Sequence, residues 1–206
     1  MTSSGRVAQP LDHAGRPGVK TVAGWDGNTE GDAQMLGTLD WQPADERHDL
    51  LAAPVAAAIG AVPDAEVAEI DPELADTAAF CERYAVPLDA SANCVIVAAK
   101  RGGEVSYAAC MVLATDRADV NGVVRKHLGA RKVSFAPMAD ATSLTDMEYG
   151  GITPVGLPAG WPVLVDEAVA AAPRVVIGSG LRKSKIMLPG KALTTLPSAV
   201  LLALAQ

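Results

Sequence analysis

The sequence predicts an α+β fold in which helices flank a central mixed β-sheet. Two apolar runs, 94–99 and 105–114, are separated by the turn-like residues 100–103 and predict a β-hairpin. A helix is expected between Asp119, a good N-cap, and Gly129, which can close a helix in the left-handed conformation. Because hairpins and helices alternate along the chain without an internal repeat, we expect one α+β domain.

The N-terminal part of this order begins with residues 1–36, which are rich in Gly, Asp, Thr and Ser and lack any sustained period. They are predicted to form a flexible extension, with a single domain over residues 37–206. An Ala-rich amphipathic stretch, 45–60, predicts a helix that Pro54 kinks or divides. The remaining expected elements, in chain order, are a strand at 66–70, a helix at 77–84 capped by Asp76, the hairpin, the 119–128 helix, a strand at 132–136, a helix within 138–145, a strand at 162–165, a helix at 166–172, strands at 174–177 and 184–188, and a closing strand or helix at 199–205.

Composition places the chain among soluble globular proteins, since 50% of its 206 residues are hydrophobic and 20% are charged. The opening residues lack the pattern of a signal peptide, and no apolar run approaches the roughly 20 residues that span a bilayer. Cys81, Cys94 and Cys110 are widely spaced and form no CxxC pair, which disfavours a zinc knuckle or a disulfide framework. We therefore expect a cytoplasmic protein.

Charge is unevenly distributed along the chain. Residues 1–89 hold 5 basic and 16 acidic side chains, a net charge of −11, whereas residues 90–206 hold 12 basic and 8 acidic side chains, a net charge of +4. The overall charge of −7 argues against nonspecific coating of nucleic acid. A basic C-terminal half could still meet an anionic partner, although a solvated mixed surface also explains these charges.

The sequence shows neither a metal-binding motif nor a recognisable catalytic triad. No HExxH, paired-cysteine or EF-hand spacing occurs, so we expect neither a metal ion nor a cofactor. His127 is the one histidine of residues 90–206 and is interpreted as a surface residue, which leaves no base for a nucleophilic triad.

Two glycine-rich segments draw attention instead. Residues 150–158 hold three glycines and two prolines, and such a loop can present backbone amides to a developing oxyanion or line a small cavity, although an ordinary structural loop is also possible. Residues 178–180, Gly-Ser-Gly, lack a phosphate-loop pattern and are interpreted as a sharp turn between strands.

Several segments together resemble the YbaK-type and prolyl-tRNA-synthetase-associated editing family over roughly residues 64–206. Their order and spacing carry the likeness more than any one segment does. They are Thr77–Phe80, Asn93–Val97, Asp119–Val120, Arg131–Pro137, Gly150–Gly156, Val163–Glu167 and Val176–Gly180.

The resemblance implies a barrel-like sheet and trans-acting hydrolysis of the ester in a mischarged tRNA, most closely the Cys- or Ala-tRNA-Pro type. It implies the tRNA acceptor end as partner, with transient contact to an aminoacyl-tRNA synthetase, and a bound water as attacking group. The family's GxxxP loop corresponds to Gly150 and Pro154. The implied catalytic residues are Asn93, Gly150, Gly151 and Pro154, and the implied substrate-binding residues are Cys94, Thr153, Asp166, Gly178, Ser179 and Gly180.

One position departs from the family pattern, because Asn93 stands where the family usually carries a lysine important for editing. An amide can donate to a carbonyl or phosphate oxygen but lacks a cation's electrostatic pull. Three readings stay open: Asn93 serves a changed substrate, Lys100 or Lys185 supplies the cation, or the domain binds tRNA ends or aminoacyl nucleotides without turnover. Cys94 beside it is a possible nucleophile, although a buried strand cysteine is the better interpretation.

Overall fold

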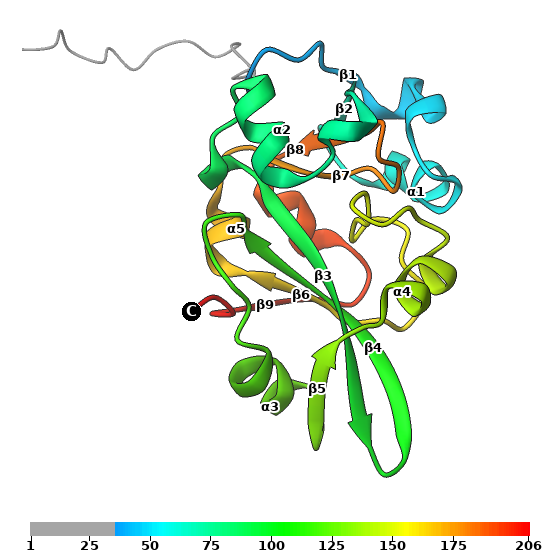
Figure 1. The fold of residues 1–206 in the computed structure, drawn as a ribbon, viewed down its shortest axis with the longest axis vertical. Helices are drawn as coiled ribbons and strands as arrows, with labels where there is room; N and C mark the ends of the chain where they lie inside the picture. The colour runs from blue at the N-terminus through cyan, green and yellow to red at the C-terminus, as the bar shows by residue number, and fades with distance from the viewer. Residues whose placement is uncertain (1–35) are drawn as a thin grey trace, which may run out of the picture. The chain divides into compact units, whose positions relative to one another are not determined.

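The computed structural model describes residues 36–206 (Figure 1), so almost all of the extension predicted for 1–36 lies outside the described residues. The strands are β1 (Gln42–Pro43), β2 (Glu66–Glu69), β3 (Ala92–Arg101), β4 (Glu104–Leu113), β5 (Lys132–Phe135), β6 (Val163–Asp166), β7 (Val175–Gly178), β8 (Ser184–Leu188) and β9 (Ala199–Leu202). The helices are α1 (Ala53–Ala58), α2 (Thr77–Tyr84), α3 (Arg125–His127), α4 (Met138–Thr145) and α5 (Glu167–Ala171). None of the described helices is long and apolar enough to cross a membrane.

The strands form two sheets, which confirms the α+β class. An antiparallel sheet has the order β1-β2-β8-β7, and a mixed sheet has the order β5-β3-β4-β6-β9, with β6 parallel to both β4 and β9. The expectation of one barrel-like sheet is not confirmed. Among residues 36–206 the two sheets are joined by a single isolated bridge, Ser91 with Val176, so backbone hydrogen bonding does not close into a barrel.

The predicted hairpin is the longest pairing, with β3 and β4 in register over ten residue pairs. Its two-residue turn uses Gly102 and Gly103, whose φ values of 61° and 90° match the positive φ that a tight hairpin turn requires. Figure 1 shows this hairpin reaching away from β7 and β8, so only the first residues of β3 lie near the smaller sheet.

Of the helix predicted over 45–60, only α1 (Ala53–Ala58) is α-helical, and the rest of the stretch is broken into short turns. Two 3₁₀ turns (Ala44–Glu46 and His48–Leu50) precede α1, and a third (Ile59–Ala61) follows it. Pro54 stands in the first turn of α1, where its missing amide hydrogen costs no helical hydrogen bond.

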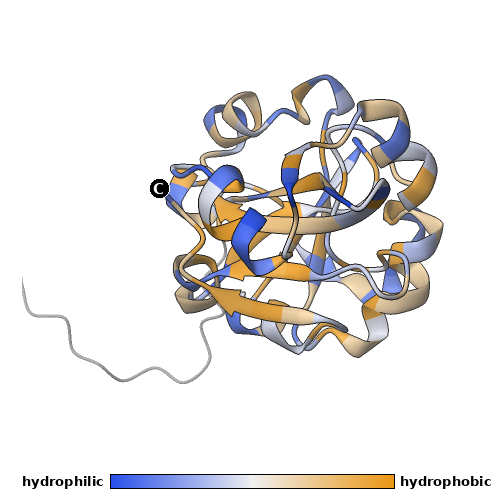
Figure 2. Ribbon diagram, turned by 90° about the horizontal axis from the view of Figure 1, so that it is seen from below, coloured by the Kyte–Doolittle hydropathy of each residue, from blue (hydrophilic) through white to orange (hydrophobic). Residues whose placement is uncertain are grey.

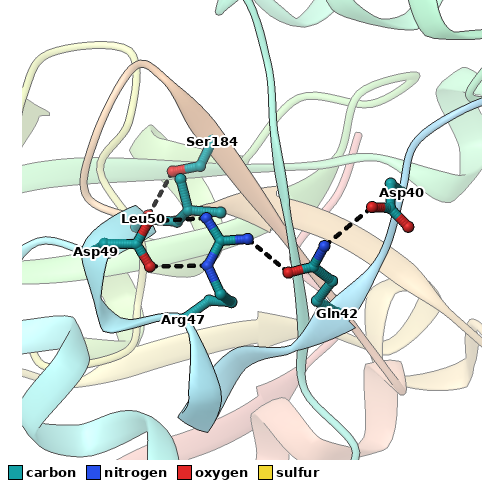
Figure 3. Close-up of polar contacts among 6 residues, drawn as sticks. All are labelled: Asp40, Gln42, Arg47, Asp49, Leu50 and Ser184. Carbon is teal, nitrogen blue, oxygen red and sulfur yellow. Dashed lines mark hydrogen bonds and ion pairs between the residues drawn. The ribbon is translucent and has the colours of Figure 1, made fainter.

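Side-chain bonds hold the same segment in place, as Figure 3 shows. Arg47 contacts both carboxylate oxygens of Asp49 and the amide oxygen of Gln42. The Ser184 hydroxyl donates to the Leu50 carbonyl and so ties the segment to β8.

Two predicted helix caps have different outcomes. The Asp119 carboxylate accepts hydrogen bonds from the amides of Gly122 and Val123, but the helix begins as a π-helical turn (Val120–Val124) before α3. Gly129 closes it with a φ of 58°, as predicted. Asp76 occupies the N-cap position of α2, yet its side chain makes no capping hydrogen bond.

Hydrophobic residues gather in three main layers, and Figure 2 shows in orange the hydrophobic strands that contribute to them. The largest cluster lies between the sheets and is covered by α1 and α5; it includes Val67, Ile186 and Val165. A second cluster covers the other face of the mixed sheet, and a third packs α2 on the outer face of the antiparallel sheet. The third layer is the one that places α2 beside the start of β3.

Candidate functional site

A cavity of about 320 Å³ opens where the two sheets meet. Its walls come from the residues before and at the start of α2, the first half of β3, the ends of β5 and β7, the start of α4, the 149–152 loop and one residue of β8. Segments that lie far apart in the sequence therefore converge on one hollow. Such a concave site with a few polar groups is where a small ligand is expected to bind.

Asn93 lines this cavity from the second position of β3 and is partly buried. The Thr77 hydroxyl donates to Asn93 Oδ1 across 2.8 Å. This bond fixes the orientation of the amide and leaves its NH₂ group to donate to a ligand. Thr77 was not singled out from the sequence, because the contact joins residues that only the fold brings together.

Backbone rather than side chains forms the wall opposite, where the glycines of 150–151 and 178–180 interlock. The Gly180 amide donates to the Gly151 carbonyl across 2.7 Å. A Cβ on Gly178 would lie 2.2 Å from that same carbonyl oxygen, and one on Gly151 would lie 2.6 Å from the Leu181 backbone. Glycine is needed here because two chain segments touch directly.

Gly150 and Gly178 line the cavity itself. Gly150 has a φ of 87°, which side-chain-bearing residues rarely adopt. The Arg182 guanidinium fastens this loop, since it donates to the carbonyls of Tyr149 and Pro72.

Cys94 also lines the cavity, next to Asn93. Burial raises the pKa of its thiol far above the ordinary value of 9.0, and neighbouring Cys110 raises it further. A thiol with such a pKa stays protonated at neutral pH and is a poor nucleophile. The lining role is therefore compatible with the structure, whereas a nucleophilic role has no support from its surroundings.

Six of the residues that the resemblance implied lie outside the cavity lining, and Gly151, described above, is one of them. Pro154 is buried and lines a separate hollow. Thr153 is fully buried, and its hydroxyl has no partner among the described residues. Ser179 bonds Ser184 and the Leu181 carbonyl within the turn after β7.

Asp166 and Gly180 complete this group. The Asp166 carboxylate caps α5 at Ala168 and accepts from the amides of Leu204 and Ala205, so it joins a helix start to the C-terminal segment. Gly180 packs with a φ of 84°, and a Cβ there would lie 2.4 Å from the Ala52 side chain.

Of the two alternative cations, the structure brings one to the cavity. Lys185 lines it from β8 and is only 7% exposed, whereas Lys100 is exposed near the hairpin turn. Three exposed apolar side chains, Phe135, Met138 and Tyr149, also contribute to the lining. Sequence reasoning did not select these three, since an exposed apolar residue carries no signal until its neighbours are known.

The chemistry available in this lining is donor-rich. It offers the Asn93 amide, the Lys185 ammonium and the Ser91 hydroxyl together with one carboxylate, that of Asp76, and no histidine is among the described residues that form it. No group of three or more His, Cys, Asp or Glu side chains within residues 36–206 is arranged to hold a metal ion. Such a site can bind a polar, oxygen-rich group and stabilise negative charge on it.

Comparison with known proteins identifies the family. The model of the aminoacyl-tRNA editing domain matches residues 71–196, more than half of the chain and all of the cavity lining. Comparison with curated proteins gives no match.

Solved structures show the same fold. One, described as a proposed trans-editing enzyme for prolyl tRNA synthetase, has a TM-score of 0.65 at 19% identity and covers 75% of this chain and 96% of its own. The hypothetical protein APE2540 has a TM-score of 0.64 at 18% identity and covers 72% of this chain and 95% of its own. With the family model matching over residues 71–196, the chain belongs to the aminoacyl-tRNA editing domain family, the YbaK family.

Proposed function

We propose that this protein is a trans-editing aminoacyl-tRNA deacylase that hydrolyses the ester of a mischarged tRNA, with Cys-tRNA-Pro or Ala-tRNA-Pro as substrate. The observation that carries the proposal is the cavity beside Asn93, whose amide is oriented by Thr77. Its partner is the aminoacylated acceptor end of tRNA, delivered free or during transient contact with a synthetase.

Ester hydrolysis in this cavity requires an attacking water and a donor for the carbonyl oxygen. The Cys94 thiol is held protonated by its surroundings, so attack by water is favoured over a covalent enzyme intermediate. The free NH₂ group of Asn93 supplies a donor for the carbonyl, and the rigid Gly150 loop forms the wall next to it.

The cavity is large enough to hold an aminoacyl group. The cavity volume of about 320 Å³ is near the lower end of the range for ligand pockets. Selection between small aminoacyl groups is limited, because one methylene changes binding by about 1 to 3 kcal/mol.

The test is a deacylation panel with tRNA-Pro carrying labelled Cys, Ala or Pro, and with other mischarged tRNAs. We expect the protein to release Cys or Ala and to spare prolyl-tRNA. Asn93→Ala should lower kcat/KM about tenfold, because a hydrogen bond made in the transition state is lost. Gln42→Ala removes an amide from β1, outside the cavity, and serves as the matched control.

The rival reading is a domain that binds tRNA ends or aminoacyl nucleotides without turnover, which the amide in place of a lysine at position 93 favours. It predicts saturable, salt-sensitive binding of the same tRNAs without released amino acid. No hydrolysis across the whole panel, together with such binding, would replace the deacylase proposal by this one. Strong deacylation by Asn93→Lys, with an inactive wild type, would also support the binding domain without turnover.

A further inference from the structure

Lys185 occupies a position where the fold otherwise places apolar side chains. It is the second residue of β8, paired with Ala68 of β2 and Gly178 of β7. Side chains alternate along a strand, so Lys185 shares the α2-facing side of β8 with Met187, a member of the hydrophobic layer under that helix. Its ammonium lies 5.3 Å from the centre of the Phe80 ring.

Burial of this ammonium is unusual because no carboxylate of the described residues forms an ion pair with it, although Asp76 at the N-cap of α2 favours its charged form from beyond ion-pair distance. The ion pairs found among residues 36–206 involve Arg47 and Arg174, and neither includes Lys185. Its Nζ donates one hydrogen bond, to the Ala75 carbonyl across 2.8 Å. Two of its three N–H groups thus have no protein acceptor among the described residues, and the side chain lines the cavity.

A lysine so placed costs stability, since buried charges are normally paired. A buried cation with two unbonded donors beside a cavity is the arrangement expected of a group that meets a ligand oxygen. Gly178, its cross-strand partner on β7, lines the same cavity, so a ligand in the cavity lies next to Lys185.

We propose that Lys185 is the cation that binds the aminoacyl ester, donating to its carbonyl oxygen together with Asn93. The inference rests on the proposed deacylase function and names a further residue for it. As the oxygen of water bonds to the carbonyl carbon, the carbonyl oxygen becomes negative and the ammonium stabilises it. The bond from carbon to the ribose oxygen then breaks, a proton from the water ends on that oxygen, and Lys185 remains protonated throughout.

The division of labour follows from charge. A charge-assisted hydrogen bond is roughly twice as strong as a neutral one, so Lys185 supplies most of the electrostatic stabilisation of the carbonyl oxygen. The Asn93 amide orients that oxygen. The cation stands on β8 rather than on β3, and it reaches the same cavity because the two sheets meet there.

Several groups set the protonation of Lys185. Burial lowers its pKa from 10.5 to about 8; Cys81 and Asp76, from α2 and its N-cap, favour the ammonium, and Arg182 from the preceding loop disfavours it. The active form is then the major one at pH 7, and activity should fall as the pH rises above 8.

The experiment compares Lys185→Met, Lys185→Arg and Lys183→Met by kcat/KM on the mischarged tRNA that the wild type cleaves, from pH 6.5 to 9.5, with thermal unfolding alongside. Lys183 is the matched control, because it is exposed and precedes the same strand. We expect Lys185→Met to lose about 100-fold in kcat/KM without a lower Tm, and the control to stay within about twofold. Lys185→Arg, which keeps its charge, should lose the decline above pH 8.

Failure of this inference is distinguishable from failure of the proposed function. A wild type that cleaves its substrate, with Lys185→Met equally active or with an unchanged pH profile, overturns the role of Lys185 and leaves the deacylase standing. If the wild type cleaves nothing, binding of 3′-alanylamino-3′-deoxyadenosine, an amide analogue of the ester, is measured by calorimetry. Binding that weakens at least tenfold in Lys185→Met supports the cation role, and unchanged binding or no wild-type binding overturns it.

Discussion

Gly178→Ala tests whether the cavity wall is packed as tightly as the structure indicates. The added Cβ would lie 2.2 Å from the Gly151 oxygen and 2.7 Å from the Ile152 oxygen, whereas ordinary contacts begin at 3.4 Å. Both neighbours are backbone atoms of one loop, so they cannot move away by a change of rotamer. The loop has to retreat by about 1.2 Å, which is the difference between 3.4 Å and 2.2 Å.

Overpacking of this kind costs about 1 to 3 kcal/mol of the free energy of unfolding. For a domain of this size the loss corresponds to a fall in Tm of roughly 2 to 12 °C. Because the displaced loop also carries Gly150, deacylation should fall at temperatures where the variant is still folded.

Gly60→Ala is the matched control, since a Cβ there meets nothing within 4 Å and the residue lies in a 3₁₀ turn. It should raise the free energy of unfolding by about 0.4 to 1 kcal/mol by restricting the unfolded chain. Urea denaturation and calorimetry measure both variants. A Gly178→Ala protein within about 0.5 kcal/mol of the wild type would refute the close packing of the two segments.

Four more outcomes are expected. Thr77→Val removes the donor that orients Asn93 and should lower kcat/KM about threefold to tenfold, with Thr77→Ser restoring it; unchanged kinetics would show that the amide needs no orientation. Cys94 should resist iodoacetamide at pH 8 in the folded protein and react after denaturation, as counted by mass spectrometry, and rapid alkylation of the folded form would contradict its raised pKa. Asp166→Ala leaves three amide donors without their acceptor and should lower the free energy of unfolding in urea by about 3 kcal/mol, a loss below about 1 kcal/mol being inconsistent with those bonds. Because the pKa of Lys185 is lower in the folded protein, the folded state binds fewer protons than the unfolded state between pH 8 and 10.5. The buried ammonium destabilises the fold fully below pH 8, and this effect is lost as the pH rises. Stability measured by urea titration should therefore rise through this window in the wild type and not in Lys185→Met.

Local chemistry made much of the fold predictable. The Gly102–Gly103 turn requires positive φ at both residues, and the Asp119 cap and Gly129 closure depend on groups within a few residues. The extent of the 45–60 helix was mispredicted because its alanine periodicity fits a helix, while contacts from Ser184 and within the Arg47 cluster decide the actual path. Whether sheets close into a barrel depends on non-local pairing that such patterns do not encode.

The candidate site was predictable only in part for the same reason. Asn93 and Gly150 stand out in the sequence, which also offered Lys185 as one of two alternative cations. Only sheet register and helix packing show that Lys185, and with it Thr77, reaches the cavity. A glycine in a sequence also fits two interpretations, an open surface for a ligand or a close contact between chain segments. Only the neighbouring backbone at Gly151 decides between them.

The interlocked glycines have a consequence for how this cavity can diversify. One wall is main chain held against main chain, so substitutions there disturb the scaffold before they alter what is recognised. The other wall is made of side chains from β3 and α4, such as Ile96, Met138 and Ala141, which can change size without moving the backbone. Substitutions that change which amino acid is accepted should therefore occur among the side chains of β3 and α4. The glycine wall should stay the same in variants of differing selectivity.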